Sequence, residues 1–181
     1  SADDREPAFS PDGGKVAFRS ERDGGGIYVV SAIGGQERLI AREGRTPQFS
    51  PDGQWIAYWT GGSKSLDSFS PGIGKMYVVP STGASPRQLR PDFYGCRYPI
   101  WAPDGQHLLF LGAPGRSETG GDWWVTQLEG GQAVQTGAYA AFVPLGFVTG
   151  SLRTGNVTTV DPSTWLGRHV VFSARQGDAM N

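Results

Sequence analysis

RTPQFSPDGQWIAY, residues 45–58, is the stretch that decides the fold, because it predicts two short strands joined by a tight turn. In that turn, Pro51 sets φ at the first central position, Asp52 is favoured at the next, and Gly53 accepts a positive φ without steric cost. The residues that follow, 55–58, favour a strand. The stretch therefore predicts a β-hairpin.

The same hairpin recurs at residues 5–18 and 97–110, and near 165–172 with a turn shortened by two residues. Three columns keep their chemistry in all four copies: Phe9, Phe49, Trp101 and Trp165; Val16, Ile56, Leu108 and Val170; and Phe18, Tyr58, Phe110 and Phe172. Two further strands are predicted after each of the first three hairpins, at 27–30 and 38–40, 76–79 and 87–89, and 123–126 and 133–134. Four antiparallel strands per repeat with an aromatic column are typical of a β-propeller blade.

The sequence therefore predicts one all-β domain, 1–181, made of about three and a half propeller blades. The blades are expected at about 5–41, 45–90 and 97–136, followed by a degenerate copy at 162–181 and separated from it by an insertion at 137–161. The insertion contains an apolar window, 138–148, that is too short to span a bilayer. We expect a strand or a segment packed on the core there, with weak strand signals at 147–148 and 157–160.

These blades resemble the TolB-type, WD-like propeller repeat, in which a Phe/Trp-Ser-Pro-Asp-Gly turn precedes an Ile-Ala-Phe-like strand and an Ile-Tyr-Val-Val-like strand. The resemblance covers roughly residues 4–136 and part of 162–175. The run of copies looks like the propeller portion of large bacterial proteins in which blades follow a serine/threonine kinase, a winged-helix regulator or a peptidase. The resemblance implies a sensor or interaction module, and it does not imply kinase or peptidase activity in this chain.

The number of blades raises the question of how the propeller closes. Complete TolB-like propellers usually have six or more blades, and an open stack would expose a strand edge and apolar blade faces. Two alternatives follow: the chain is a piece of a longer propeller, or two copies form a homodimer that completes the ring.

Composition excludes some classes of partner. A net charge of −1 and a pI near 6.1 argue against a nucleic-acid-binding surface. No basic segment followed by an apolar one is present, so we expect no signal peptide and no membrane insertion. The compartment stays open between the cytoplasm and the bacterial periplasm or another extracytoplasmic space.

No group of residues predicts catalysis, a metal site or a cofactor. Cys96 is the sole cysteine and is expected as a half-buried side chain on a loop. His107 and His169 occupy the same position in their repeats, where the other copies have Lys15 and Trp55. This variety predicts a half-exposed strand position and not a metal site. The aspartates of the turns, Asp12, Asp52 and Asp104, are explained by turn geometry. We therefore expect that the chain is not an enzyme.

Binding is expected on one face of the propeller, where the loops 20–26, 41–46, 61–74, 91–98 and 112–122 converge. Arg5, Arg45 and Arg97 each begin an Arg-x-Pro frame, and equivalent positions in successive blades surround one axis. A ring of guanidinium groups would suit a carboxylate, a phosphate or an acidic loop, although Asp161 takes this place in the fourth copy. The alternative is that each arginine caps a blade carbonyl or pairs with a nearby acid: Asp4, Glu43 or Asp92.

Three aromatic residues of one connection between blades, Phe93, Tyr94 and Tyr98, either anchor a protein partner or pack between blades. The sequence thus favours a non-catalytic module that binds a protein or a small anionic ligand at its loop face. The alternatives are a propeller cap or accessory domain of a hydrolase, serine peptidase or kinase whose catalytic domain is absent, and a purely structural scaffold.

Overall fold

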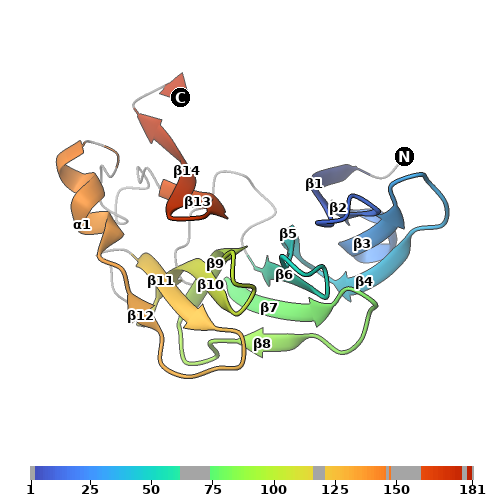
Figure 1. Cartoon of the computed structure of the whole chain (residues 1–181), viewed down its shortest axis with the longest axis horizontal. Coiled ribbons are helices and arrows are strands. Elements are labelled where there is room, and N and C mark those ends of the chain that lie inside the picture. Colours follow the sequence, from blue (N-terminus) through green and yellow to red (C-terminus); the bar gives the residue numbers. More distant parts are fainter. Residues whose placement is uncertain are drawn as a thin grey trace.

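The computed structural model of the chain describes residues 3–61, 74–115, 121–145, 147, 160–176 and 179–180. In these residues the strands form three four-stranded antiparallel sheets and one three-stranded sheet. Strands follow one another in chain order within each complete sheet, which confirms the predicted all-β propeller blades. Figure 1 shows the sheets arranged along an open arc.

The strands of the four blades have the following bounds. Blade 1 contains β1 (Asp4–Phe9), β2 (Lys15–Ser20), β3 (Gly26–Ser31) and β4 (Arg38–Arg42), with a short helical turn η1 (Arg22–Gly24). Blade 2 contains β5 (Arg45–Phe49), β6 (Trp55–Thr60), β7 (Lys75–Pro80) and β8 (Arg87–Leu89). Blade 3 contains β9 (Gly95–Trp101), β10 (His107–Ala113), β11 (Asp122–Gln127) and β12 (Val134–Gln135). Blade 4 contains β13 (Val160–Leu166), β14 (His169–Gln176) and β15 (Ala179–Met180).

The turn between the first two strands has the predicted chemistry in blades 1–3. The turn glycines Gly13, Gly53 and Gly105 have φ values of +70°, +70° and +66°. In blade 2, Ser50 Oγ donates to Asp52 Oδ1 at 2.5 Å, and the same carboxylate oxygen accepts from the amide of Gln54 at 3.0 Å. The turn aspartate is therefore satisfied within the turn, as the sequence predicts.

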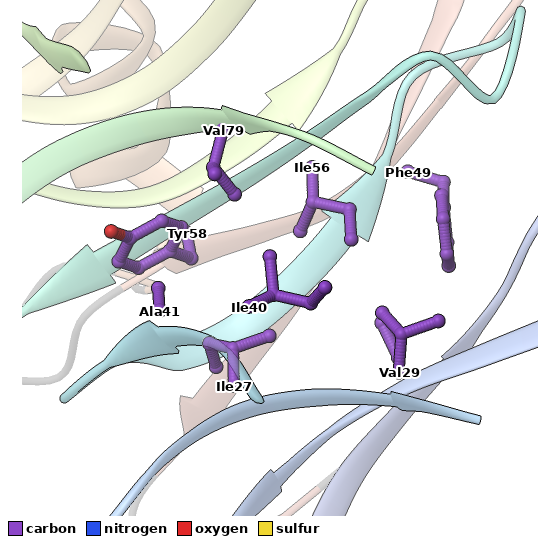
Figure 2. Close-up of a cluster of buried hydrophobic side chains, with 9 residues drawn as sticks. Ile27, Val29, Ile40, Ala41, Phe49, Ile56, Tyr58 and Val79 are labelled. Carbon is purple, nitrogen blue, oxygen red and sulfur yellow. The ribbon is translucent and has the colours of Figure 1, made fainter. Parts of the chain in front are cut away.

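Blades pack face to face through the predicted apolar columns. Figure 2 shows the cluster between blades 1 and 2, where Ile27, Val29 and Ile40 lie opposite Phe49, Ile56 and Tyr58. Ile27 and Ile56 are fully buried, and burying such a side chain contributes about 1.5–3 kcal/mol. The indole Nε1 of Trp101 in blade 3 donates to the carbonyl of Gln48 in blade 2 at 3.0 Å, which also ties neighbouring blades together.

The first strand of each blade is the inner one. Strands β1 and β5, β5 and β9, and β9 and β13 contact each other, whereas β8 and β12 lie on the outer side of the arc (Figure 1). We call the side that carries the β2–β3-type loops and the connections between blades the loop face. The opposite side, with the Ser-Pro-Asp-Gly-type turns, is the turn face.

Arginine residues of the fourth strands join the outer parts of neighbouring blades. Arg38 on β4 donates to the carbonyls of Thr82 and Ser81 in blade 2, at 2.5 and 3.2 Å. Arg87, at the same position of β8, donates to the carbonyl of Leu128 in blade 3 at 2.8 Å. We call this repeated contact the inter-blade arginine clamp.

The apolar window at the start of the insertion, 138–148, begins with a helix and not with the expected strand. Residues at its start form α1 (Ala138–Phe142) and the short turn η2 (Val143–Leu145), so the expected strand is wrong, whereas packing on the core is confirmed. Phe142 contacts Trp123 and Phe172, with ring centroids 5.1 Å apart in both pairs. A helix forms because Tyr139 and Phe142, three residues apart, then share one face. Of the expected strand at 147–148, residue 147 lies in a bend and residue 148 lies outside the described residues; of that at 157–160, only residue 160 is described, and it begins β13.

A buried carboxylate holds the start of α1. Asp122, at the first position of β11, accepts hydrogen bonds from the amides of Gly137 and Tyr139, at 3.0 and 3.1 Å. It also accepts from Gln135 Nε2 at 2.9 Å and from the amide of Trp123 at 2.7 Å. These bonds fix the insertion to the outer half of blade 3. Among the described residues, no helix is long and apolar enough to cross a bilayer.

Candidate functional site

The inner strands carry a backbone irregularity beside each predicted arginine. The residue between the arginine and the proline has a left-handed φ in blades 1–3: +55° at Glu6, +45° at Thr46 and +50° at Tyr98. Such a conformation costs a residue with a Cβ about 1–3 kcal/mol. Strand pairing shifts at the same place in all three blades, and a bulge of this kind bends a strand and re-aims its side chains.

Strand pairing places the three arginines and Asp161 at equivalent positions. Arg5, Arg45, Arg97 and Asp161 lie opposite Arg19, Trp59, Leu111 and Ser173, each of which directly follows the aromatic column of the second strand. In blade 4 the pairing shift between Pro162 and Thr164 absorbs one extra residue. Asp161 thus takes the place of an arginine.

Two of the arginines converge on one indole. The guanidinium carbons of Arg45 and Arg97 lie 5.8 and 5.7 Å from the ring centroid of Trp59, within the range of a cation–π interaction. Trp59 Nε1 donates to Thr46 Oγ1 at 2.7 Å, which fixes the plane of the ring. Tyr98 meets Trp59 edge to face, with centroids 5.2 Å apart. We call this group the Trp59 cluster: Arg45, Thr46, Trp59, Arg97 and Tyr98.

The cluster is largely shielded from water, which changes its acid–base properties. Arg97 is only 7 % exposed, and burial lowers the pKa of its guanidinium; the nearby charge of Arg45 lowers it further, whereas Tyr98 and Asp161 raise it. Burial, with Asp161 adding to it, raises the pKa of Tyr98 to about 12, so its hydroxyl keeps its proton at neutral pH. The cluster therefore contains two cations and a neutral phenol, with two carboxylates nearby, Glu6 and Asp161.

Arg5 stands apart from the other two arginines. It is exposed, and its Nε donates to Asp3 Oδ2 at 2.8 Å. Two of the acids considered as partners pair with other arginines: Asp4 with Arg22, and Asp92 with Arg90. Blade 1 reaches the cluster region through Glu6, whose carboxylate accepts from the amide of Thr46 at 2.6 Å.

The three aromatic residues have different surroundings. Phe93 packs between rings, with its centroid 5.3 Å from Phe110 and 5.0 Å from Trp124, as one of the two alternatives expects. Tyr94 is exposed on the connection before β9. Tyr98 lies on β9 itself rather than in the loop and belongs to the Trp59 cluster.

Sequence reasoning missed two members of the cluster, Thr46 and Trp59, although the sequence contains a signal for Trp59. Its position directly after the column residue Tyr58 places it on the other side of the strand from the column. An aromatic residue at that position, where the other copies have Arg19, Leu111 and Ser173, is the signal that was available.

Other reactive side chains have structural surroundings. Cys96 lies on β9 and is buried, so the expectation of a half-buried residue on a loop is wrong; burial raises the pKa of its thiol to about 12. The strand begins at Gly95, which places Cys96 in the core between blades 2 and 3. His107 Nδ1 lies 2.7 Å from Asp104 Oδ2. Over the described ranges, no three His, Cys, Asp or Glu side chains gather in a way that could hold a metal ion.

Comparison with known proteins gives distant relatives named as peptidases. The chain is 24 % identical over 172 residues to "Uncharacterized peptidase YuxL" of Bacillus subtilis, an alignment that covers 82 % of this chain and 25 % of that protein. It is 29 % identical over 119 residues to "Dipeptidyl-peptidase 5" of Porphyromonas gingivalis, covering 58 % of this chain and 17 % of the relative. The chain thus spans a quarter or less of these proteins, and no protein-family profile matches it.

Solved structures match the fold. TolB from Acinetobacter baumannii superposes with a TM-score of 0.63 and 18 % identity, over 98 % of this chain and 39 % of that one. The β-propeller domain of the trilobed protease from Pyrococcus furiosus superposes with a TM-score of 0.53 and 19 % identity, over 75 % of this chain and 43 % of that one. The chain therefore has the fold of a TolB-type β-propeller.

Proposed function

We propose that the chain is a non-catalytic propeller module that binds an anionic group, carried by a protein partner or a small ligand, at the Trp59 cluster. The observation that carries this proposal is the placement of two guanidinium groups, Arg45 and Arg97, on the same indole ring. Like charges held together in a shielded place repel each other, and a bound anion would relieve that repulsion.

The chemistry of the cluster supports an oxyanion as the bound group. A guanidinium offers a planar fork of donors that matches a carboxylate or a phosphate. The neutral hydroxyl of Tyr98 could supply one more donor, because its pKa is raised to about 12. Asp161 and Glu6 offset part of the positive charge, which favours an anion of low charge over a polyanion.

Calorimetric titration of the chain with inorganic phosphate, and with a short acidic peptide, tests this proposal. We expect the double variant Arg45→Ala, Arg97→Ala to lose binding, because both forks are removed. Arg168→Ala is the matched control, since this exposed arginine lies in the β13–β14 turn on the opposite face. Unchanged binding by the double variant would reject the proposal.

A second candidate is the accessory propeller of a peptidase whose catalytic domain lies outside these 181 residues. The names of both relatives, and their much greater length, favour it. In that case the chain alone remains non-catalytic, and the anionic group belongs to a peptide substrate or to another domain. Hydrolysis of a peptide by the chain alone would contradict both candidates.

A further inference from the structure

Aspartate is followed directly by glycine at four places in the sequence: Asp12–Gly13, Asp23–Gly24, Asp52–Gly53 and Asp104–Gly105. In such a pair, the amide nitrogen of the glycine can attack the side-chain carboxyl carbon, Cγ, of the aspartate. The four pairs are equivalent by sequence, because each glycine presents a nitrogen that no Cβ of its own residue shields. The structure separates one pair from the other three.

The aspartates of the three hairpin turns have carboxylates that are held in place. Asp12 and Asp52 each accept from the hydroxyl of the serine two residues earlier, at 2.5 Å, and from the amide two residues later, at 3.0 Å. Asp104 accepts from the amides of Gln106 and His107, at 2.8 and 3.1 Å, and its second oxygen lies 2.7 Å from His107 Nδ1. None of these carboxyl groups can turn toward the next amide without losing these bonds.

The glycine nitrogens of the same turns are held as well. The amides of Gly13, Gly53 and Gly105 donate to the carbonyl three residues earlier, at 2.8, 2.8 and 3.0 Å. Both reacting groups of each turn are therefore occupied, and a ring can close between them only after the turn opens locally.

Asp23 lies in η1, the loop between β2 and β3, and has different surroundings. Its side chain is exposed, and its backbone has φ +51° and ψ +31°. Over the described residues, its carboxylate makes no hydrogen bond and no ion pair. Gly24 and Gly25 follow with φ values of +91°, and a Cβ at Gly24 would meet no atom within 4 Å. The Asp23 carboxyl group can therefore reach the Gly24 nitrogen without breaking a bond of its own.

We propose that Asp23 is a modification site, at which the chain isomerises spontaneously to isoaspartate. The Gly24 nitrogen forms a bond to Cγ of Asp23, and the carboxyl hydroxyl leaves with the amide proton as one water molecule, which gives a cyclic imide. One water molecule then opens the imide. Opening at Cγ restores aspartate, whereas opening at the main-chain carbonyl carbon leaves a chain that runs through Cβ and Cγ. No oxidant or reductant is needed, the mass is unchanged, and the proposal does not depend on the anion site.

The neighbours of Asp23 indicate that the product keeps the fold. Isoaspartate lengthens the main chain by one methylene group. On one side of it, Arg22 is anchored, because its Nε donates to Ser20 Oγ at 2.8 Å and its Nη2 pairs with Asp4 at 2.7 Å. On the other side, Gly26 pairs with Ser20 where β3 begins. The extra methylene is therefore taken up within the loop, and the paired strands stay as they are.

Peptide mapping of the aged, folded chain tests the proposal. The chain is kept in mildly acidic buffer, digested, and analysed by mass spectrometry with electron-transfer fragmentation, which distinguishes aspartate from isoaspartate. We expect isoaspartate to form at Asp23 at least about ten times faster than at Asp12, Asp52 or Asp104, because those three react only from locally opened forms. Equal rates at the four positions, or no isoaspartate at Asp23, would overturn the proposal.

The same ageing in concentrated urea separates the effect of structure from that of sequence. We expect the four rates to agree within about three-fold there, because the turns that protect three of the pairs are lost. If Asp23 kept its whole lead in urea, its neighbours in the sequence would be the cause, and the structural explanation would be overturned.

An Asp23→Glu variant identifies the site in the intact chain. It keeps a carboxylate at this position, but the ring that glutamate would have to form is larger and closes far more slowly. After ageing, we expect an isoaspartate-specific methyltransferase to label Asp23→Glu much less than the parent chain. Asp92→Glu is the matched control and should be labelled like the parent, because Asp92 is exposed and precedes phenylalanine. Undiminished labelling of Asp23→Glu would overturn the proposal.

Discussion

Trp59 shows how a single residue sets the character of the candidate site. It pairs with Arg45 across the inner hairpin, bonds Thr46 through its indole nitrogen, and lies beside Arg97 of the next blade. A flat, polarisable ring can hold two guanidinium groups through its faces, which an aliphatic residue such as Leu111 cannot do. The site therefore lies at the boundary of blades 2 and 3. The arginine pattern of the sequence alone would place one equivalent arginine in each of blades 1–3, around the central axis.

At the same scale, the turn aspartates predict how stability depends on pH. Hydrogen bonds from Ser10 and Ser50 hold the pKa values of Asp12 and Asp52 below the ordinary 3.8. A carboxylate with a lower pKa in the folded state stabilises the fold above its unfolded pKa, and this contribution is lost as pH falls through the folded pKa. We expect the urea midpoint to drop below about pH 4, and to drop less in Asp52→Asn.

Denaturation in urea at neutral and acidic pH measures this difference. Asp23→Asn provides a control, since Asp23 lies in η1 and in none of these turns. Equal acid sensitivity of Asp52→Asn and the parent chain would show that the turn carboxylates do not carry the effect.

Among the structural elements, the hairpin turn is the most sensitive to substitution. Gly53 has a φ of +70°, and an added Cβ would meet only Pro11 at an ordinary 3.5 Å, so the cost of Gly53→Ala is backbone strain alone. We expect the free energy of unfolding to fall by about 1–2 kcal/mol. Urea denaturation measures this change.

Gly14→Ala is the matched control for the turn. Gly14 immediately follows Gly13 in blade 1, its φ lies outside the left-handed region, and the equivalent residues in blades 2 and 3 are glutamines. We expect it to be neutral or slightly stabilising, because it lowers the entropy of the unfolded chain. A loss as large as that of Gly53→Ala would contradict this explanation.

Elements that depend on near neighbours in the chain could be predicted, and those that depend on distant ones could not. The hairpins follow from turn residues and alternating columns, which are local. The helix α1 was missed because Asp122, which anchors its first amides, precedes Gly137 by a whole strand and turn. The left-handed φ of Thr46 and Tyr98 was missed because a residue before proline ordinarily favours an extended backbone.

In the whole molecule, the inter-blade arginine clamp determines how firmly the outer strands of neighbouring blades are joined. Arg87→Met keeps an unbranched apolar stem and removes the guanidinium group with its bond to the Leu128 carbonyl. We expect a loss of about 1 kcal/mol in the free energy of unfolding, measured in urea. Arg168→Met, on an exposed turn, is the control and should change it by less than about 0.5 kcal/mol.

The inter-blade arginine clamp joins blade 1 to blade 2 and blade 2 to blade 3, but it is not repeated between blades 3 and 4. Val134, in β12, pairs with Val125 as Arg38 pairs with Val29 and Arg87 with Val78. Blade 3 therefore has no arginine to offer at this position. Its neighbour, blade 4, is three-stranded in the part of the chain that the structure describes.

The claim that an anion binds at the Trp59 cluster is tested most directly by nuclear magnetic resonance of the tryptophan indole N–H groups during a phosphate titration. The Trp59 signal is identified by its absence in Trp59→Phe. We predict that it shifts and saturates with phosphate while the Trp165 signal stays in place, and that the shift disappears in the double variant Arg45→Ala, Arg97→Ala. A Trp59 signal that does not move in the folded chain would contradict the claim.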